Sequence, residues 1–299
     1  MKRGYLQILL AAALFLLALG LTLYPVVSNW YIGRHQSRIQ TEYREVLEQT
    51  DSAEIESIRE SAAAYNKTIT PGAAEKAYSQ ESIRLAAEDY VNQVDVSGSG
   101  IMGYVEIPKI GADLPIYHGT GADSLDRGTG HLLGSSLPVG GESTHTIITG
   151  HSGMASQKMF TDLEQLREGD IFYLHVLDET LTYEVREIHT VLPHDTTYLG
   201  IEPGEDLCTL VTCTPTGVNT HRLLVHGSRI PYVPTEETEA SAVLHEENTD
   251  SNWEKQYWLG VRLGLAAMVF LTLVAGAVLY IRRNRGRAVH RKGGRYVRK

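Results

Sequence analysis

A thiol, an imidazole and a guanidinium occur at the ends of predicted strands, where they could act together as a catalytic group. The apolar stretch 207–212 predicts a strand that ends in Cys213, and a turn rich in proline and glycine separates it from a second strand that starts at Arg222. Another apolar strand stops just before His151. We therefore expect the thiol and the guanidinium to face each other across one connection, with the imidazole as their partner.

These three side chains suit acyl transfer through a covalent intermediate. The thiolate is the reactive form of cysteine, and a nearby cation favours it. His151 could supply that charge and then protonate a leaving amine, while Arg222, which keeps its proton, could hold a carbonyl or an oxyanion. Attack on a peptide carbonyl would give a thioacyl intermediate, and its resolution by water or by an amine decides between hydrolysis and transfer.

The spacing of the two cysteines argues against a disulfide. Cys208 and Cys213 are an odd number of residues apart on one predicted strand, so their side chains point to opposite faces, about 16 Å apart. A disulfide needs Cα atoms within about 7 Å of each other. We expect Cys208 to pack as a small apolar residue. His145 and His151 are neighbours in sequence, but no Cys-x-x-Cys or His-x-x-x-His pattern is present, so we predict neither a metal nor a cofactor.

Charge and hydropathy predict a chain that crosses a membrane twice. The apolar stretches 5–27 and 263–281 are each about long enough to span a bilayer. The alternative for the first stretch is a cleavable signal peptide, but the stretch is longer than the apolar core of such a peptide, so we expect an uncleaved anchor. Nine of the 27 Lys and Arg residues lie in 282–299, and two precede the first stretch. All 36 Asp and Glu residues lie between the two stretches, giving that segment a charge of about −21. The positive-inside rule then places both ends in the cytoplasm and the acidic middle outside. Beside a membrane span, a basic tail favours contact with lipids over nucleic acid.

Alternating strands dominate the middle of the chain, after two helices. The spacing of apolar residues over 37–65 predicts two helices that break near 50–52, with Ser52 as the N-cap of the second. A further helix is expected over 79–94, and the compact domain should begin after the hinge 97–100. A short helix is expected over 160–166. Eight strands, which favour a closed barrel or a sandwich, are predicted over 103–107, 114–117, 130–133, 144–149, 171–177, 181–192, 208–212 and 223–230.

Three segments of this chain resemble the signature segments of sortases, the Gram-positive surface transpeptidases. They are Thr149-Gly-His-Ser-Gly153, Thr209-Leu-Val-Thr-Cys-Thr-Pro215 and Asn219-Thr-His-Arg-Leu-Leu-Val-His-Gly227. Upstream segments such as Met102-Gly-Tyr-Val-Glu-Ile-Pro-Lys-Ile110 and Leu114-Pro-Ile-Tyr-His-Gly119 are similar to the pilus-building class C in particular. The resemblance covers about 101–230.

The resemblance implies a mainly β fold: an eight-stranded barrel with an N-terminal helical segment and a transmembrane helix at each end. It makes Cys213 the nucleophile, His151 the acid and base, and Arg222 the stabiliser of the oxyanion. It also places the sorting signal against the loop 194–205. The substrate-binding residues expected from it are Thr212, Thr214, Asn219, His194, Leu199 and Ile201. Class C members commonly carry an Asp-Pro-aromatic lid motif, and no Asp-Pro dipeptide occurs between positions 66 and 100.

The expected activity is cleavage of a Leu-Pro-x-Thr-Gly-like signal after Thr and transfer of the acyl group to a pilin lysine. The expected partners are pilin subunits, membrane lipids and, as an alternative acceptor, a peptidoglycan precursor, with no nucleic acid. A sortase that anchors proteins to peptidoglycan and a non-enzymatic two-span binding module are the competing hypotheses. The expected segments are a cytoplasmic terminus at 1–4, an anchor at 5–28, a helical or lid segment at 29–100, the barrel at 101–232, an acidic linker at 233–256, a second span at 257–281 and a basic cytoplasmic tail at 282–299.

Overall fold

The structure is a computed structural model that describes residues 2–70, 72, 89–154, 157–232 and 257–276. It forms two compact units, one of Met1–Val27 with Glu254–Lys299 and the other of Ser28–Trp253. The expected acidic linker and the basic tail lie outside the described residues. All candidate catalytic residues belong to the second unit.

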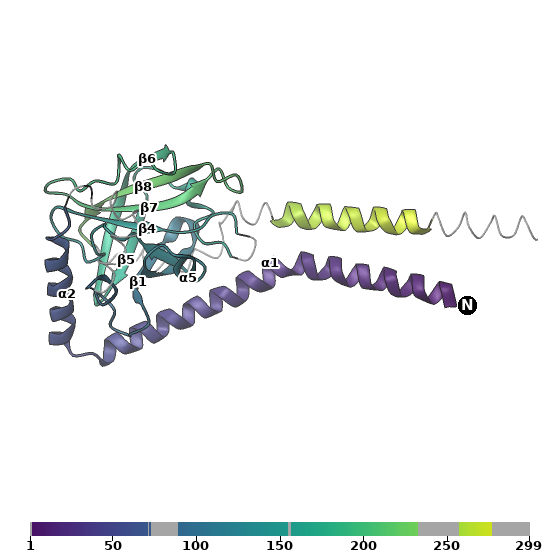
Figure 1. Cartoon of the computed structure of the whole chain (residues 1–299), viewed down its shortest axis with the longest axis horizontal. Coiled ribbons are helices and arrows are strands. Elements are labelled where there is room, and N and C mark those ends of the chain that lie inside the picture. Colours follow the sequence, from purple (N-terminus) through teal and green to yellow (C-terminus); the bar gives the residue numbers. More distant parts are fainter. Residues whose placement is uncertain (1, 71, 73–88, 155–156, 233–256, 277–299) are drawn as a thin grey trace, which may run out of the picture. The chain divides into compact units, whose positions relative to one another are not determined.

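Eight strands close into a barrel in the order β1-β2-β3-β4-β7-β8-β6-β5. Figure 1 shows β4, β7 and β8 as neighbours in this barrel. This confirms the predicted eight-stranded, mainly β fold, and closure leaves no strand edge exposed. Each predicted strand is present, with ends that differ by a few residues. The strands expected over 114–117 and 208–212 are longer at both ends, and the one expected over 130–133 ends at residue 131. The strands are β1 (Ile101–Ile107), β2 (Ala112–His118), β3 (Thr129–His131), β4 (Thr144–Thr149), β5 (Ile171–Val176), β6 (Glu179–Val191), β7 (Asp206–Thr214) and β8 (His221–Ile230).

The register of three neighbouring strands determines the geometry of the site. β4 pairs with β7 in parallel, with Thr149 opposite Val211. β7 pairs with β8 in antiparallel fashion, with Cys213 opposite Arg222. Because successive side chains on a strand point to opposite faces, residues of one parity on β7 face the barrel interior and the others face outward.

The two faces of these strands carry two separate apolar clusters. Cys208, Leu210 and Val225 belong to the large interior core. The opposite face carries a smaller group, here called the outer cluster, which contains Leu132, Ile147, Val191, Val211 and Leu224. Both cysteines are free, and Cys208 is fully buried, as predicted.

Two helices precede the barrel and pack on it. α1 (Lys2–Gln49) ends just before the predicted break, and α2 (Ser52–Asn66) follows it. The predicted N-cap was wrong. Asp51 has the extended backbone of a cap and accepts the Ala53 N–H at 2.7 Å, whereas Ser52 is already the first helical residue.

Side chains of both helices bond to backbone groups of the second unit. Tyr43 of α1 donates its hydroxyl to the Met102 carbonyl at 3.2 Å and accepts the Leu177 N–H at 3.0 Å. Burial raises the pKa of Tyr43 to about 12. Asn66 at the end of α2 exchanges two hydrogen bonds with the backbone of Leu137. Residues 28–49 of α1 and the whole of α2 are therefore part of the packed unit.

The packed unit begins earlier than predicted, because residues before the hinge 97–100 belong to the core. Tyr90 and Val94 are buried in the interior cluster. The Tyr90 hydroxyl lies 2.8 Å from Nδ1 of His131 and accepts the Gly119 N–H at 2.9 Å. Most of the helix predicted over 79–94 lies outside the described residues.

The helix predicted over 160–166 was also wrong. The structure has only a 3-10 turn, η2 (Leu163–Gln165), because the Phe160 N–H donates to the His151 carbonyl at 3.0 Å and the Phe160 ring is buried against Gly150. These contacts hold Phe160 against the loop that follows β4, so the segment does not start as a helix.

The other unit contains a helix over Tyr257–Gly276, with mean hydropathy 2.0. Among the described residues it is the one helix long and apolar enough to cross a membrane, and it fits a membrane anchor. Near the N-terminus, the apolar stretch Ala12–Tyr24 of α1 is shorter. Inside this unit, the Tyr257 hydroxyl donates to the Thr22 carbonyl at 3.3 Å. The N-terminal span stays a prediction.

Candidate active site

Cys213 lies near the end of β7 with its side chain half-buried. By the alternation along the strand, it points to the same face as Val211 of the outer cluster and away from the interior. Its carbonyl accepts a hydrogen bond from the Ser152 hydroxyl at 2.6 Å. The thiol is thus presented at the barrel surface while the backbone around it is fixed.

Arg222 is the direct cross-strand partner of Cys213. Side chains of such partners on one face have Cβ atoms roughly 5 Å apart, so the guanidinium lies within reach of a group bound to the thiol. Nη1 of Arg222 donates to the carbonyls of His221 at 3.1 Å and Asn219 at 3.4 Å. These bonds use one edge of the guanidinium and leave its remaining N–H groups for a ligand.

His151 follows β4 by two residues, and β4 runs beside β7. Thr149 is level with Val211, and His151 and Cys213 each follow two residues later, so we infer that they lie near each other. Gly150 donates its N–H to the Val211 carbonyl at 3.0 Å, which extends the pairing beyond the strand. Three chain segments distant in sequence thereby bring the thiol, the imidazole and the guanidinium to one surface.

The hydroxyls of the two threonines beside Cys213 bond to the loop that carries His151. Thr212 is buried and donates to the Gly150 carbonyl at 2.8 Å. Thr214 is buried and donates to a carboxylate oxygen of Glu164 at 2.6 Å. Both were predicted to bind substrate; here their hydroxyls tie β7 to the segment 150–166.

The remaining residues predicted to bind substrate differ in exposure and in their neighbours. Asn219 is exposed, has a positive φ of 61°, and offers its carbonyl to Arg222. In the loop between β6 and β7, His194 is exposed, Leu199 is half-buried against the outer cluster, and Ile201 is half-buried. Of the predicted substrate-binding residues, only Leu199 lines the pocket described next.

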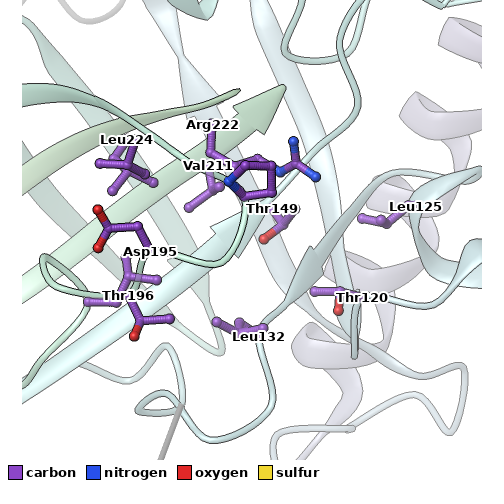
Figure 2. A pocket seen from close by; sticks show the side chains of 12 residues that line it. Thr120, Leu125, Leu132, Thr149, Asp195, Thr196, Val211, Arg222 and Leu224 are labelled. Carbon is purple, nitrogen blue, oxygen red and sulfur yellow. The ribbon is translucent and has the colours of Figure 1, made fainter. Parts of the chain in front are cut away.

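A pocket lies beside Arg222, between the outer face of the barrel and the β6–β7 loop (Figure 2). Its base is formed by strand residues that include Thr149, Val211 and Leu224, and Leu125 of α5 (Ala122–Leu125) lines one side. The loop contributes Pro193, Asp195, Thr196 and Leu199. An extended apolar segment with a few polar groups could bind in such a pocket.

Opposite charges line this pocket. Asp195 accepts hydrogen bonds from the Thr197 hydroxyl and backbone N–H, and these bonds lower the pKa of its carboxyl. A carboxylate and the Arg222 guanidinium therefore both border the space where a ligand would lie.

Two carboxylates near the catalytic residues were not predicted from the sequence. Asp126 lies 3.9 Å from Nε2 of His151, and Glu164 accepts from Thr214. Neither carboxylate belongs to a sequence motif. Asp126 follows α5 and Glu164 lies in η2, and both elements are connections whose position depends on the folded barrel. His145, considered above beside His151, is instead bonded to Gly200 and Thr209.

Comparison with known proteins agrees with this geometry. The sortase domain family matches residues 105–230. The solved structure of Streptococcus pneumoniae sortase C is 44% identical, covers 66% of this chain and 100% of that chain, and has a TM-score of 0.60. The pilus-related sortase C of Group B Streptococcus is 38% identical, covers 64% of this chain and 97% of that chain, and has a TM-score of 0.57.

A more distant relative matches over a longer part of the chain. Sortase A of Streptococcus agalactiae is 27% identical over 227 residues, which cover 75% of this chain and 84% of the relative. The matched fold includes the strands that carry the thiol, the imidazole and the guanidinium. The chain therefore belongs to the sortase family of cysteine transpeptidases, and the structures that it matches include pilus-related class C members.

Proposed function

We propose that this chain is a membrane-anchored pilus sortase that joins pilin subunits through lysine side chains. The observation that carries the proposal is the pairing of Cys213 with Arg222, which lines a pocket between the barrel and the β6–β7 loop. The pairing of β4 with β7, which ends two residues before His151 and Cys213, supports His151 as the third member. The pilus-related sortase C of Group B Streptococcus and the S. pneumoniae sortase C, which has pilin substrates, support the choice of substrate class.

In the proposed reaction, the Cys213 thiolate attacks the carbonyl carbon of Thr in a Leu-Pro-x-Thr-Gly-like signal. The Thr–Gly bond breaks, His151 gives a proton to the departing glycine amine, and a thioester to Cys213 remains. A lysine amine then attacks the thioester, loses a proton to His151 and expels the thiolate. Arg222 stabilises the oxyanion in both steps.

Thr212, Thr214 and Asn219 have supporting roles in this scheme, and His194, Leu199 and Ile201 belong to the loop against which the sorting signal binds. Leu199 would contact the signal directly, since it lines the pocket. The reaction as written uses no metal or cofactor.

The proposed location is the membrane, with both termini in the cytoplasm and the barrel outside. The helix Tyr257–Gly276 supports one anchor, and the apolar stretch of α1 with its flanking Lys2 and Arg3 supports the other. Tethering the barrel beside membrane-bound pilins would raise their effective concentration. Protease protection in sealed vesicles tests the orientation: the barrel should be cut only from the outer side.

The test of the activity uses the full chain in detergent micelles, a Leu-Pro-x-Thr-Gly peptide library, and two acceptors: a lysine-bearing pilin peptide and a peptidoglycan cross-bridge amine. Mass spectrometry should find cleavage after Thr, an acyl adduct on Cys213 and transfer to lysine. Transfer to the cross-bridge amine alone would favour the cell-wall-anchoring alternative, and the absence of adduct and cleavage would favour a binding module.

A further inference from the structure

The outer face of β4, β7 and β8 carries a second group of polar residues at the end away from the active site. The register places Thr209 of β7 level with Ile147 of β4 and opposite His226 of β8. The outer cluster lies between this group and the catalytic residues. His145, Thr209 and His226 are all buried, at 2%, 0% and 4% exposure. The reaction proposed above uses none of them.

These three side chains form a hydrogen-bonded chain with one direction. Nδ1 of His145 lies 2.7 Å from the Gly200 carbonyl, which can only accept, so this nitrogen carries the proton. Nε2 of neutral His145 must then accept, and it lies 2.6 Å from the Thr209 hydroxyl. The Thr209 oxygen in turn lies 2.7 Å from Nδ1 of His226, which therefore donates. The proton order follows from the fixed carbonyl at one end.

This hydrogen-bonded chain of side chains connects the sheet to the β6–β7 loop. Gly200 belongs to this loop, next to Leu199, which lines the pocket and packs on the outer cluster. The Tyr198 ring stacks on His189 of β6, with ring centroids 3.9 Å apart. Thus a part-buried hydrogen bond, an aromatic stack and an apolar contact join this part of the loop to the outer face, beside the ion pair between Arg186 of β6 and Glu202 of the loop.

We propose that the His145–Thr209–His226 chain is a positioning device that holds the β6–β7 loop over the pocket and thereby sets the affinity for the sorting signal. This inference rests on the proposed function in taking the pocket as the site of the sorting signal. The three residues act through the loop and do not touch the reacting atoms.

The environment of the His145–Thr209–His226 chain favours the neutral form of both imidazoles. Burial lowers the pKa of His145 and lowers the pKa of His226 to about 4. Nε2 of His226 is buried and has no hydrogen-bond partner. A proton added there would be an unpaired buried donor, which is costly. The charged groups around the chain come from β6 and from the loop: they are Arg186, Glu187, His189 and Glu202, and Arg186 bonds to both carboxylates.

The test compares Thr209→Val with Thr209→Ser in the full chain. Valine has the shape of threonine without the hydroxyl, and serine keeps the hydroxyl. Thr209→Val removes both hydrogen bonds of the hydroxyl, but only the bond to His145 lies on the side of the loop. Losing that one bond, worth about 1–1.5 kcal/mol, corresponds to a roughly five- to tenfold change in an equilibrium constant. We therefore expect Thr209→Val to raise KM for the sorting peptide about five- to tenfold with kcat nearly unchanged, and Thr209→Ser to behave as wild type.

Two measurements separate loop positioning from general damage. Amide hydrogen exchange over 196–204 should be faster in Thr209→Val and unchanged in Thr209→Ser, with exchange in β7 and β8 the same in both. Alkylation of Cys213 by iodoacetamide should proceed at the wild-type rate in both variants. Wild-type KM and wild-type loop exchange in Thr209→Val would overturn the proposal, as would a fall in kcat at constant KM.

A second pair keeps the proposal testable if Thr209→Val does not fold. His145→Asn can keep a donor to the Gly200 carbonyl, whereas His145→Leu cannot. Slower loop exchange in His145→Asn than in His145→Leu supports the device, and equal exchange in the two refutes it. The exchange measurement needs no substrate, so failure of the wild type to cleave peptide would count against the proposed function alone.

Discussion

Cys208 and Cys213 lie on the same strand and differ in almost every property that determines reactivity. Cys208 points into the barrel core, where burial raises the pKa of its thiol well above the usual value. Cys213 points to the outer face, is half-buried, and faces Arg222. The difference indicates that the inner face of β7 contributes to the core, while its outer face presents the proposed nucleophile.

The largest expected effect separates the two cysteines. Cys213→Ala should lower turnover of a sorting peptide by at least about a thousandfold and abolish the acyl adduct, because the proposed thioester forms on this sulfur. Cys208→Ala removes one buried sulfur and should keep kcat nearly unchanged. Steady-state kinetics with intact-mass analysis measures both. Full activity in Cys213→Ala would contradict the assignment of the nucleophile.

A somewhat smaller effect is expected for the cation opposite the thiol. Arg222→Ala should lower kcat about 10²- to 10³-fold, the usual cost of losing an oxyanion donor. Arg222→Lys keeps the charge but not the planar set of donors, so it should recover only part of that loss. Circular dichroism of both variants serves as the folding control. Equal activity of Arg222→Lys and wild type would mean that charge alone suffices.

Neighbouring residues on the two faces provide a matched pair for stability. Leu210 is fully buried in the interior, and Leu210→Ala should lower the free energy of unfolding by about 2–5 kcal/mol. Val211 lines the pocket, so Val211→Ala should cost less stability, about 1–2 kcal/mol, and should raise KM for the sorting peptide. Denaturant titration and kinetics measure the two effects. A reversed pattern would break the division between the faces.

Acid should weaken the fold through histidines buried as neutral groups, His226 on the outer face and His131 beside Tyr90. Burial lowers the pKa of each to about 4 from an ordinary value near 6.5. The unfolded chain therefore binds protons first as pH falls, so stability is full above about pH 6.5 and declines toward pH 4. Each group contributes at most about 3 kcal/mol, at roughly 1.4 kcal/mol per pKa unit.

Unfolding curves between pH 7 and pH 4 measure this decline. His226→Gln and His131→Gln should each show a shallower loss of stability with acid than wild type, even if less stable at pH 7. His194, which is exposed in the β6–β7 loop, provides the control: His194→Gln should follow the wild-type curve. A wild-type pH dependence in all three variants would rule out the buried histidines as its source.

Local patterns in the sequence predicted the strands and the opposite orientation of the two cysteines, because alternation along a strand is a local property. They predicted the break between α1 and α2 but indicated the wrong N-cap, Ser52 instead of Asp51. Both residue types favour the N-cap position, and only the backbone conformation shows which residue occupies it. The helix expected over 160–166 failed because contacts of Phe160 with residues beyond the segment outweigh its local preference.

Contacts that depend on the pairing of distant strands could not be predicted. β4 lies beside β7 although β5 and β6 intervene in the chain, and this pairing brings His145 to Thr209. The distance between Asp126 and His151 likewise depends on how the short connection that contains α5 packs on the folded barrel. The candidate catalytic residues were proposed because they stand at the ends of predicted strands and because the motifs around them resemble a family. Asp126 lies outside those motifs, and Thr209, which begins one of them, had no signal that marked its contact with His145.

The hydrogen bonds between β7 and the His151 loop have a consequence for the energetics of each turnover. Thr212, Thr214 and the Cys213 carbonyl join the nucleophile strand to the segment that carries the acid and base. The entropy lost in fixing these two parts is therefore incurred once, when the protein folds. Each catalytic cycle starts from a preorganised pair, so the ordering that remains falls on the substrate and on the loop that receives it.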